Sequence, residues 1–215
     1  MMVVRNGEDY VGQCLSVIAP HVKRMKVAID GRSNDKTGEI VFGLASQFGN
    51  IEISSFVVSN PMTDLVEMRN SQLVFHEEWG FIVDSDEYHQ DIEKYQLGDE
   101  DAYGLQCWAV WNETHAHKQS SKINVGRFFR NYPDIVWKGQ WGKEALFRGD
   151  KKVFEKPAMI PHRYIHFTHV KKDDWRSEMN QRRVADNKRL IRMPDDIIKT
   201  IKEIHHEKMP RLPRN

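Results

Sequence analysis

A short acidic stretch follows an apolar segment at residues 81–87. Phe81, Ile82 and Val83 predict a buried strand, and Asp84-Ser85-Asp86-Glu87 comes directly after it. In α/β proteins, ligands bind outside the carboxyl ends of the strands. The carboxylate oxygens of an Asp-x-Asp pair suit Mg²⁺ or Mn²⁺, and a metal there could hold the phosphates of a nucleotide. Taken alone, the pattern is explained more simply by an acidic, solvated turn, so the preceding elements must decide between the two interpretations.

The chain before residue 81 alternates between predicted strands and helices. Three such alternations, followed by a fourth strand, predict a parallel, right-handed α/β sheet. Asp30 follows the second strand, which puts a second acid on the edge that carries Asp84. Asp30 could instead satisfy local backbone amides in a turn, but two acids on one edge favour a nucleotide site. Strands are expected at 1–4, 27–29 and 51–58, and helices from Tyr10, from a cap at Asp35, and from Thr63 or Asp64.

The regular alternation ends after Glu87. The later segments contain more predicted strands than helices, with a helical C-terminal part that is broken at Pro194. The expected elements are a short helix within 91–97, strands at 103–111, 127–130, 135–137 and within 160–170, a polar loop at 115–122, and helix from 172 onward.

Charge and composition exclude several classes of protein. The 215 residues carry a net charge of +1, which argues against a general nucleic-acid binder. Residues 171–215 hold 13 Lys and Arg against 8 Asp and Glu, which suits a solvated helical face or contact with an anionic membrane surface. Cys14 and Cys107 lack a Cys-x-x-Cys partner, so we expect two buried free thiols in a reducing compartment. No apolar run approaches the ~18 residues of a membrane span, and no signal peptide is visible. These features predict a cytoplasmic protein.

Several motifs occur in a fixed order along the first half of the chain. Arg5-Asn6-Gly7-Glu8 and Cys14-Leu15-Ser16-Val17 come first, and Asp30-Gly31-Arg32-Ser33-Asn34-Asp35-Lys36-Thr37 follows. Met68-Arg69-Asn70 and Val83-Asp84-Ser85-Asp86-Glu87 complete the series. Together they resemble the N-terminal half of the family 2 glycosyltransferases, which have the GT-A fold. The resemblance covers most of residues 2–90 and continues more weakly through 127–133, 137–139 and 166–168. Arg32 stands where a small residue is common in that family, and Gly142 and Lys143 stand where many relatives have a His-Glu pair.

The resemblance implies a fold and a set of site residues. It implies a GT-A type α/β fold with a Rossmann-like, mostly parallel sheet flanked by helices. One domain would span 1–215, with a nucleotide-sugar half at 1–90, a smaller acceptor-side β region at 91–170 and C-terminal helices at 171–215. Asp30 would contact the base or ribose, Arg69 the base or phosphates, and Asp86 would be the main ligand of Mn²⁺ or Mg²⁺. The implied nucleotide-binding residues are Val4, Arg5, Asn6, Asp30, Arg69, Asp84 and Ser85, and the implied metal ligands are Asp84, Asp86, and His166 or His169.

Each of these side chains also has a simpler explanation. Arg69 without the two aspartates would be an exposed helical arginine, although its rigid fork suits phosphate oxygens. Single histidines such as His166 and His169 are more often hydrogen-bonded structural residues.

An inverting glycosyltransferase also needs a general base for the acceptor hydroxyl. Glu144 is our candidate, because it lies between Trp141 and Phe147 in the region that resembles the acceptor segment. Glu113 and Glu155 are alternatives, and a surface carboxylate explains Glu144 equally well.

The sequence therefore predicts a metal-dependent glycosyltransferase. It would move a sugar from a nucleoside-diphosphate sugar to a hydroxyl of a glycan or lipid-linked saccharide, with peripheral membrane contact through the basic C-terminal segment. A nucleotidyltransferase is a weaker alternative, because the loop at Arg5–Asp9 is acidic where that class needs a Gly-rich, basic phosphate loop. A non-catalytic sugar-nucleotide binding module is the other alternative, and the altered residues Gly142 and Lys143 favour it.

Overall fold

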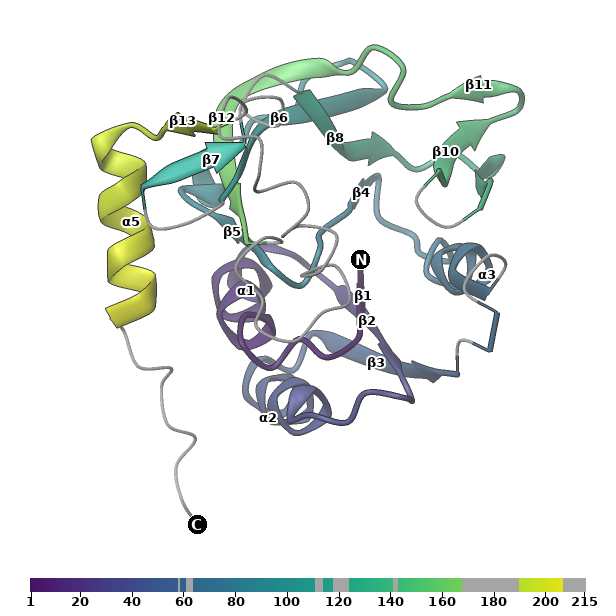
Figure 1. Ribbon diagram of the computed structural model, residues 1–215. Coiled ribbons are helices and arrows are strands. Elements are labelled where there is room, and N and C mark those ends of the chain that lie inside the picture. The colour runs from purple at the N-terminus through teal and green to yellow at the C-terminus, as the bar shows by residue number, and fades with distance from the viewer. Residues whose placement is uncertain are drawn as a thin grey trace.

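The computed structural model describes residues 1–57, 59–60, 64–110, 114–117, 124–140, 143–167 and 190–206. Its N-terminal part is a parallel three-stranded sheet in the order β1-β2-β3, covered by helices on both faces (Figure 1). The strands and helices alternate as the sequence predicts, so this part has an α/β fold. The elements are β1 (Met2–Val4), α1 (Val11–Ile18), β2 (Met25–Asp30), α2 (Thr37–Phe48), β3 (Ile51–Phe56) and α3 (Asp64–Ser71).

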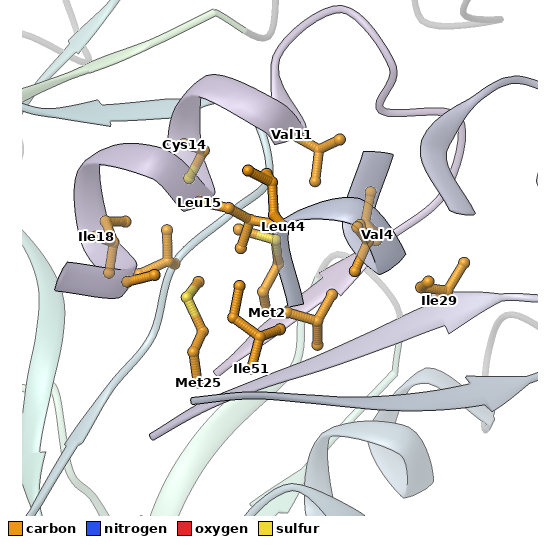
Figure 2. Packing of buried hydrophobic residues seen from close by; sticks show 14 of the residues in the cluster. Met2, Val4, Val11, Cys14, Leu15, Ile18, Met25, Ile29, Leu44 and Ile51 are labelled. Carbon is orange, nitrogen blue, oxygen red and sulfur yellow. The ribbon is translucent and has the colours of Figure 1, made fainter. Parts of the chain in front are cut away.

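Side-chain alternation along β2 divides the helices between the two faces of this sheet. Val27 and Ile29 point toward α1 and α2, and Figure 2 shows this cluster around Leu15 and Leu44. Ala28 points the other way and packs against Met68 of α3. The apolar positions that the helical spacing of α1 predicts are all buried: Val11, Cys14, Leu15 and Ile18.

The ends of α2 lie next to the predicted signals. The N-cap is Lys36, one residue after the predicted cap at Asp35, and it makes no side-chain cap hydrogen bond. The Asp35 carboxylate accepts hydrogen bonds from the backbone nitrogen and the hydroxyl of Thr37, the first residue of the helix. Gly49 ends the helix in the left-handed region with φ 71°, a conformation that glycine adopts without strain.

β4 (Trp79–Phe81) connects this sheet to a second one. The main-chain nitrogen of Met1 donates to Phe81, and Val83 donates to Met1, so this segment runs parallel to β1. β4 also pairs with the five-stranded sheet β4-β8-β6-β12-β5, in which the β6–β12 pairing is parallel and the others are antiparallel. The predicted parallel sheet is therefore present in β1–β3 and in the segment beside β1. The second β region differs from the prediction, because its five-stranded sheet is larger than the first and mostly antiparallel. The strands of the second sheet are β5 (Glu87–His89), β6 (Ala102–Ala109), β8 (Asn124–Arg130) and β12 (Ala158–His166).

Two small sheets and a helix complete the described part of the chain. The predicted strand at 135–137 does not pair with β8, because it forms a separate antiparallel sheet with the residues that follow. Residues 115–117 of the polar loop predicted at 115–122 form a strand instead, in which Ala116 is buried, and residues 118–122 lie outside the described part of the chain. Helix predicted from 172 onward falls partly outside the described residues, and 190–192 is a strand. The elements are β9 (Ile135–Lys138), β10 (Ala145–Arg148), β11 (Lys151–Lys152), β7 (His115–His117) paired with β13 (Leu190–Arg192), α5 (Asp195–His206), and 3₁₀ turns η1 (Ala19–His21) and η2 (Ile92–Lys94).

The remaining composition-based expectations concern thiols and membranes. Cys14 and Cys107 are both buried and free, as predicted. Within the described residues, no helix has the length and apolar character that crossing a membrane requires.

Candidate functional site

The predicted acids lie at the carboxyl edge of the parallel strands. Asp30 is the last residue of β2. Asp84 follows the segment that runs parallel to β1, where Glu87 closes a turn by donating to the carbonyl of Asp84 at 3.2 Å. Ile82 and Val83 are buried and fix the start of this turn. The sheet therefore directs both acids to one edge, as the sequence predicts.

Two guanidinium groups face the Asp84 carboxylate. Arg127 Nη2 lies 3.3 Å from Oδ2, and Arg69 Nη2 lies 4.0 Å from Oδ1. Burial alone would raise the pKa of Asp84, but Arg127, His166 and Arg69 together hold that pKa below its ordinary value. Asp84 is consequently an ionised carboxylate at neutral pH.

Asp86 and His166 meet on the other side of the turn. His166 Nε2 lies 3.3 Å from Asp86 Oδ1, and the backbone of Phe167 donates to the carbonyl of Asp86 at 2.9 Å. Burial would lower the pKa of His166, but the Asp86 carboxylate raises it well above the ordinary histidine value. His166 is therefore protonated beside Asp86 when no metal is bound, and a cation would have to displace that proton before the imidazole could be a ligand. His169 lies outside the described residues.

The acids and His166 could hold a divalent cation. Asp84, Glu87 and His166 each offer one ligand atom, and these atoms lie within 4.8 Å of one another. Asp86 is not a member of this group, but its Oδ1 lies 3.3 Å from His166 Nε2, so it stands beside the same imidazole. A mixed set of carboxylate oxygens and one imidazole suits Mn²⁺ better than Mg²⁺, because Mg²⁺ prefers oxygen ligands.

A buried ion pair supports this turn from below. Glu87 contacts Arg127 through one oxygen and His89 Nε2 through the other, at 2.9 Å, and its side chain has no exposed surface. Arg127 also donates to the Tyr164 hydroxyl at 2.9 Å. The sequence interpretation did not assign Arg127 or Glu87 to the site. Glu87 could have been noticed as the third acid of the motif, but nothing local separates Arg127 from the more exposed Arg130 on the same strand.

A cavity of about 290 Å³ opens beside Asp84. Helix α3 and strand β9 form part of its wall, and Asn70 joins them through two hydrogen bonds to the backbone of Trp137, at 2.7 and 3.1 Å. The Arg69 guanidinium lies 4.8 Å from the centre of the Trp137 ring. Residues that line the cavity include Arg69, Asp84, Arg127, Trp137, Glu144 and Lys152.

Glu144 lines this cavity, whereas the alternative base Glu155 does not. Its Oε1 lies 3.7 Å from Arg69 Nη2. Glu155 is exposed and is not part of the lining, and Glu113 and Trp141 lie outside the described residues.

Unsatisfied polar atoms converge on the cavity. In the described residues, five buried side-chain nitrogen or oxygen atoms have no hydrogen-bond partner. Three of the five, Arg69 Nε, Arg127 Nε and Glu144 Oε2, belong to residues that line this cavity. Buried polar groups are normally hydrogen-bonded, so this concentration indicates a place where a polar ligand or water is expected.

The predicted base-binding residue Asp30 already has a partner. Arg32 donates to its carboxylate through the backbone nitrogen, Nε and Nη2, at 3.0, 3.2 and 2.8 Å, and Arg5 Nε lies 3.9 Å away. Burial would raise the pKa of Asp30, but the hydrogen bonds and charge of Arg32 hold it below its ordinary value. A nucleotide at Asp30 would therefore have to share this carboxylate with Arg32.

The remaining predicted residues shape the loops at this edge. Val4 is buried in the core. Asn6 adopts φ 47°, and its side chain accepts a hydrogen bond from the backbone of Asn34, which ties the first loop to the second. Ser85 is buried below the turn, close to Gly7.

A comparison with protein-family models finds no match, and a comparison with curated proteins finds no significant match. The family resemblance of the motifs therefore stays a prediction.

Proposed function

We propose that this chain is a metal-dependent glycosyltransferase of the GT-A type. It transfers a sugar from a nucleoside-diphosphate sugar to an acceptor hydroxyl of a saccharide or lipid-linked saccharide. The observation that carries the proposal is that Asp84, Arg69 and Glu144 meet in one cavity at the carboxyl edge of the strands. A metal-binding acid, a phosphate-binding cation and a candidate base are the three functions that this transfer requires.

The residues would divide the reaction between two ends of the site. Asp84, Asp86 and His166 would hold Mn²⁺ or Mg²⁺, which offsets the negative charge that builds on the leaving diphosphate. Arg69 would contact the phosphate oxygens, for which its planar fork is suited. Glu144 would accept the proton of the acceptor hydroxyl while the acceptor oxygen bonds to the anomeric carbon and the diphosphate leaves. Asp30 and Arg32 would lie toward the base and ribose.

Nucleotide binding in the presence and absence of metal tests the first half of this proposal. Calorimetry with UDP and GDP should show binding in Mn²⁺ that is lost in EDTA. Asp86→Asn keeps the shape of the side chain and removes its charge, so the Mn²⁺-dependent affinity should fall at least ~10-fold, as for other residues that support a metal. Asp99→Asn is the matched control, because Asp99 is exposed and lies outside the cavity. An unchanged affinity in Asp86→Asn would mean that the acids form a solvated turn and no metal site.

A transfer assay separates an enzyme from a binding module. The wild type is incubated with a panel of nucleotide sugars and saccharide acceptors in Mn²⁺, and sugar transfer and donor hydrolysis are measured. Metal-dependent nucleotide binding without either reaction would favour the non-catalytic module, for which Gly142 and Lys143 already give a sequence argument.

A further inference from the structure

One nitrogen atom of Arg69 lies between two carboxylates that belong to different ends of the site. Nη2 is 4.0 Å from Asp84 Oδ1 and 3.7 Å from Glu144 Oε1. Both distances are longer than a hydrogen bond. The guanidinium is instead supported from one side by the Trp137 ring, 4.8 Å from its centre. Arg69 therefore attracts both carboxylates electrostatically but forms a hydrogen bond with neither.

The neighbouring cation Arg127 is held much more firmly. It contacts Asp84, Glu87 and the Tyr164 hydroxyl, and only 7% of the residue is exposed. A change of charge near Asp84 would therefore move Arg69 more easily than Arg127, because Arg69 has no hydrogen bond to either carboxylate. Because Asn70 locks α3 to β9, that movement would be confined to the Arg69 side chain.

The unsatisfied atoms on the two partners show that each has bonding capacity left. Arg69 Nε and Glu144 Oε2 are both buried and lack a hydrogen-bond partner. A guanidinium that turned toward a phosphate could form a bidentate pair. The Glu144 carboxylate would then lose its cation and could accept a hydrogen bond from a hydroxyl.

We propose that Arg69 couples the two ends of the site, because the bound diphosphate and Glu144 compete for its single positive charge. This inference rests on the proposed function, since it assumes that a diphosphate binds at the Asp84 end. Donor binding draws Arg69 away from Glu144 and releases the carboxylate for the acceptor hydroxyl. The acceptor end therefore becomes competent after the donor has bound, and Arg69 acts as a positioning residue for Glu144.

The reciprocity of coupled binding gives a test that does not depend on catalysis. If Glu144 competes with the diphosphate, removing the charge of Glu144 must strengthen diphosphate binding. Calorimetry with UDP in Mn²⁺, or with GDP if UDP does not bind, should therefore show about fivefold or greater tightening in Glu144→Gln, the low end of usual coupling factors. The same substitution in an Arg69→Met background should leave the affinity unchanged.

Asp150→Asn is the matched control for loss of one negative charge. Asp150 lies in the turn between β10 and β11, but its side chain is fully exposed and pairs with Lys138 at 4.0 Å. The Asp150→Asn variant should bind UDP with the same affinity as the wild type. Thermal unfolding checks that each variant is folded, and Arg69→Gln replaces Arg69→Met if the latter is not.

Two results would overturn the inference. One is an unchanged UDP affinity in Glu144→Gln, and the other is an equal tightening with and without Arg69, which would indicate a general field effect. Failure of the proposed function looks different, because the wild type itself would then bind neither UDP nor GDP in Mn²⁺.

Discussion

The buried pair of Arg127 and Glu87 predicts a large loss of stability when one partner is removed. The Glu87 side chain has no exposed surface and that of Arg127 is 9% exposed. In Arg127→Met, Glu87 keeps only His89 as a partner, and a buried carboxylate has lost its countercharge. Breaking a buried pair in this way typically costs about 3–5 kcal/mol, a large fraction of the roughly 5–15 kcal/mol that stabilises a domain.

Arg130→Met is the control on the same strand. Arg130 pairs with Glu78, whose side chain is 66% exposed, and stacks on Trp79 at 4.6 Å. An exposed ion pair contributes ~1 kcal/mol or less, and a stacked cation about as much again. Urea unfolding at neutral pH, followed by tryptophan fluorescence, should therefore separate the two variants by about 1 kcal/mol or more, the smallest difference between these ranges.

A second substitution tests the stated cause of the loss. Glu87→Gln in the Arg127→Met background removes the unpaired charge, so part of the lost stability should return. The reasoning is refuted if Arg127→Met costs no more than Arg130→Met, or if the double variant is less stable than Arg127→Met alone.

Three further predictions concern chemistry, pH and packing. Glu144→Gln should lower the rate of sugar transfer ~100-fold or more while the fold stays intact, which transfer kinetics would measure. Although burial opposes it, Arg32 holds the pKa of Asp30 below its ordinary 3.8. The difference in the free energy of unfolding between the wild type and Arg32→Met should therefore be largest above about pH 4. It should shrink as the pH falls through the lowered pKa, as urea unfolding at several pH values would show. Gly126→Ala places a methyl group 2.1–2.7 Å from Phe154, so it should destabilise the chain by ~1–3 kcal/mol, and Phe154→Leu in the same chain should restore part of this.

The first half of the fold follows from the sequence because its signals are local. The helical spacing from Val11 to Ile18, the hydrogen bonds from Thr37 to Asp35 before α2 and the stop at Gly49 each depend on residues close in the chain. The second sheet is different, because its order joins segments that lie far apart. Nothing near residues 135–137 indicates that this strand pairs forward with β10 and not back with β8.

The same distinction applies to the site. Asp84, Asp86 and His166 stand in short motifs, so the sequence identifies them, and the structure brings them together. Arg127 owes its place to Glu87 and Tyr164, two partners that are distant in sequence. The sequence also does not predict that the Arg32 guanidinium pairs with the Asp30 carboxylate, because a turn of the same composition could point the guanidinium into solvent.

The pairing of β5 with β12 has a consequence for when the site forms during folding. His166 lies opposite Glu87 in this antiparallel ladder, and the backbone of Phe167 donates to Asp86. His166, the third ligand of the proposed metal site, therefore reaches Asp86 through main-chain register. Contacts between segments so far apart in sequence are slow to form, because a long loop must close first. The proposed metal site should consequently form late in refolding, together with the docking of β12.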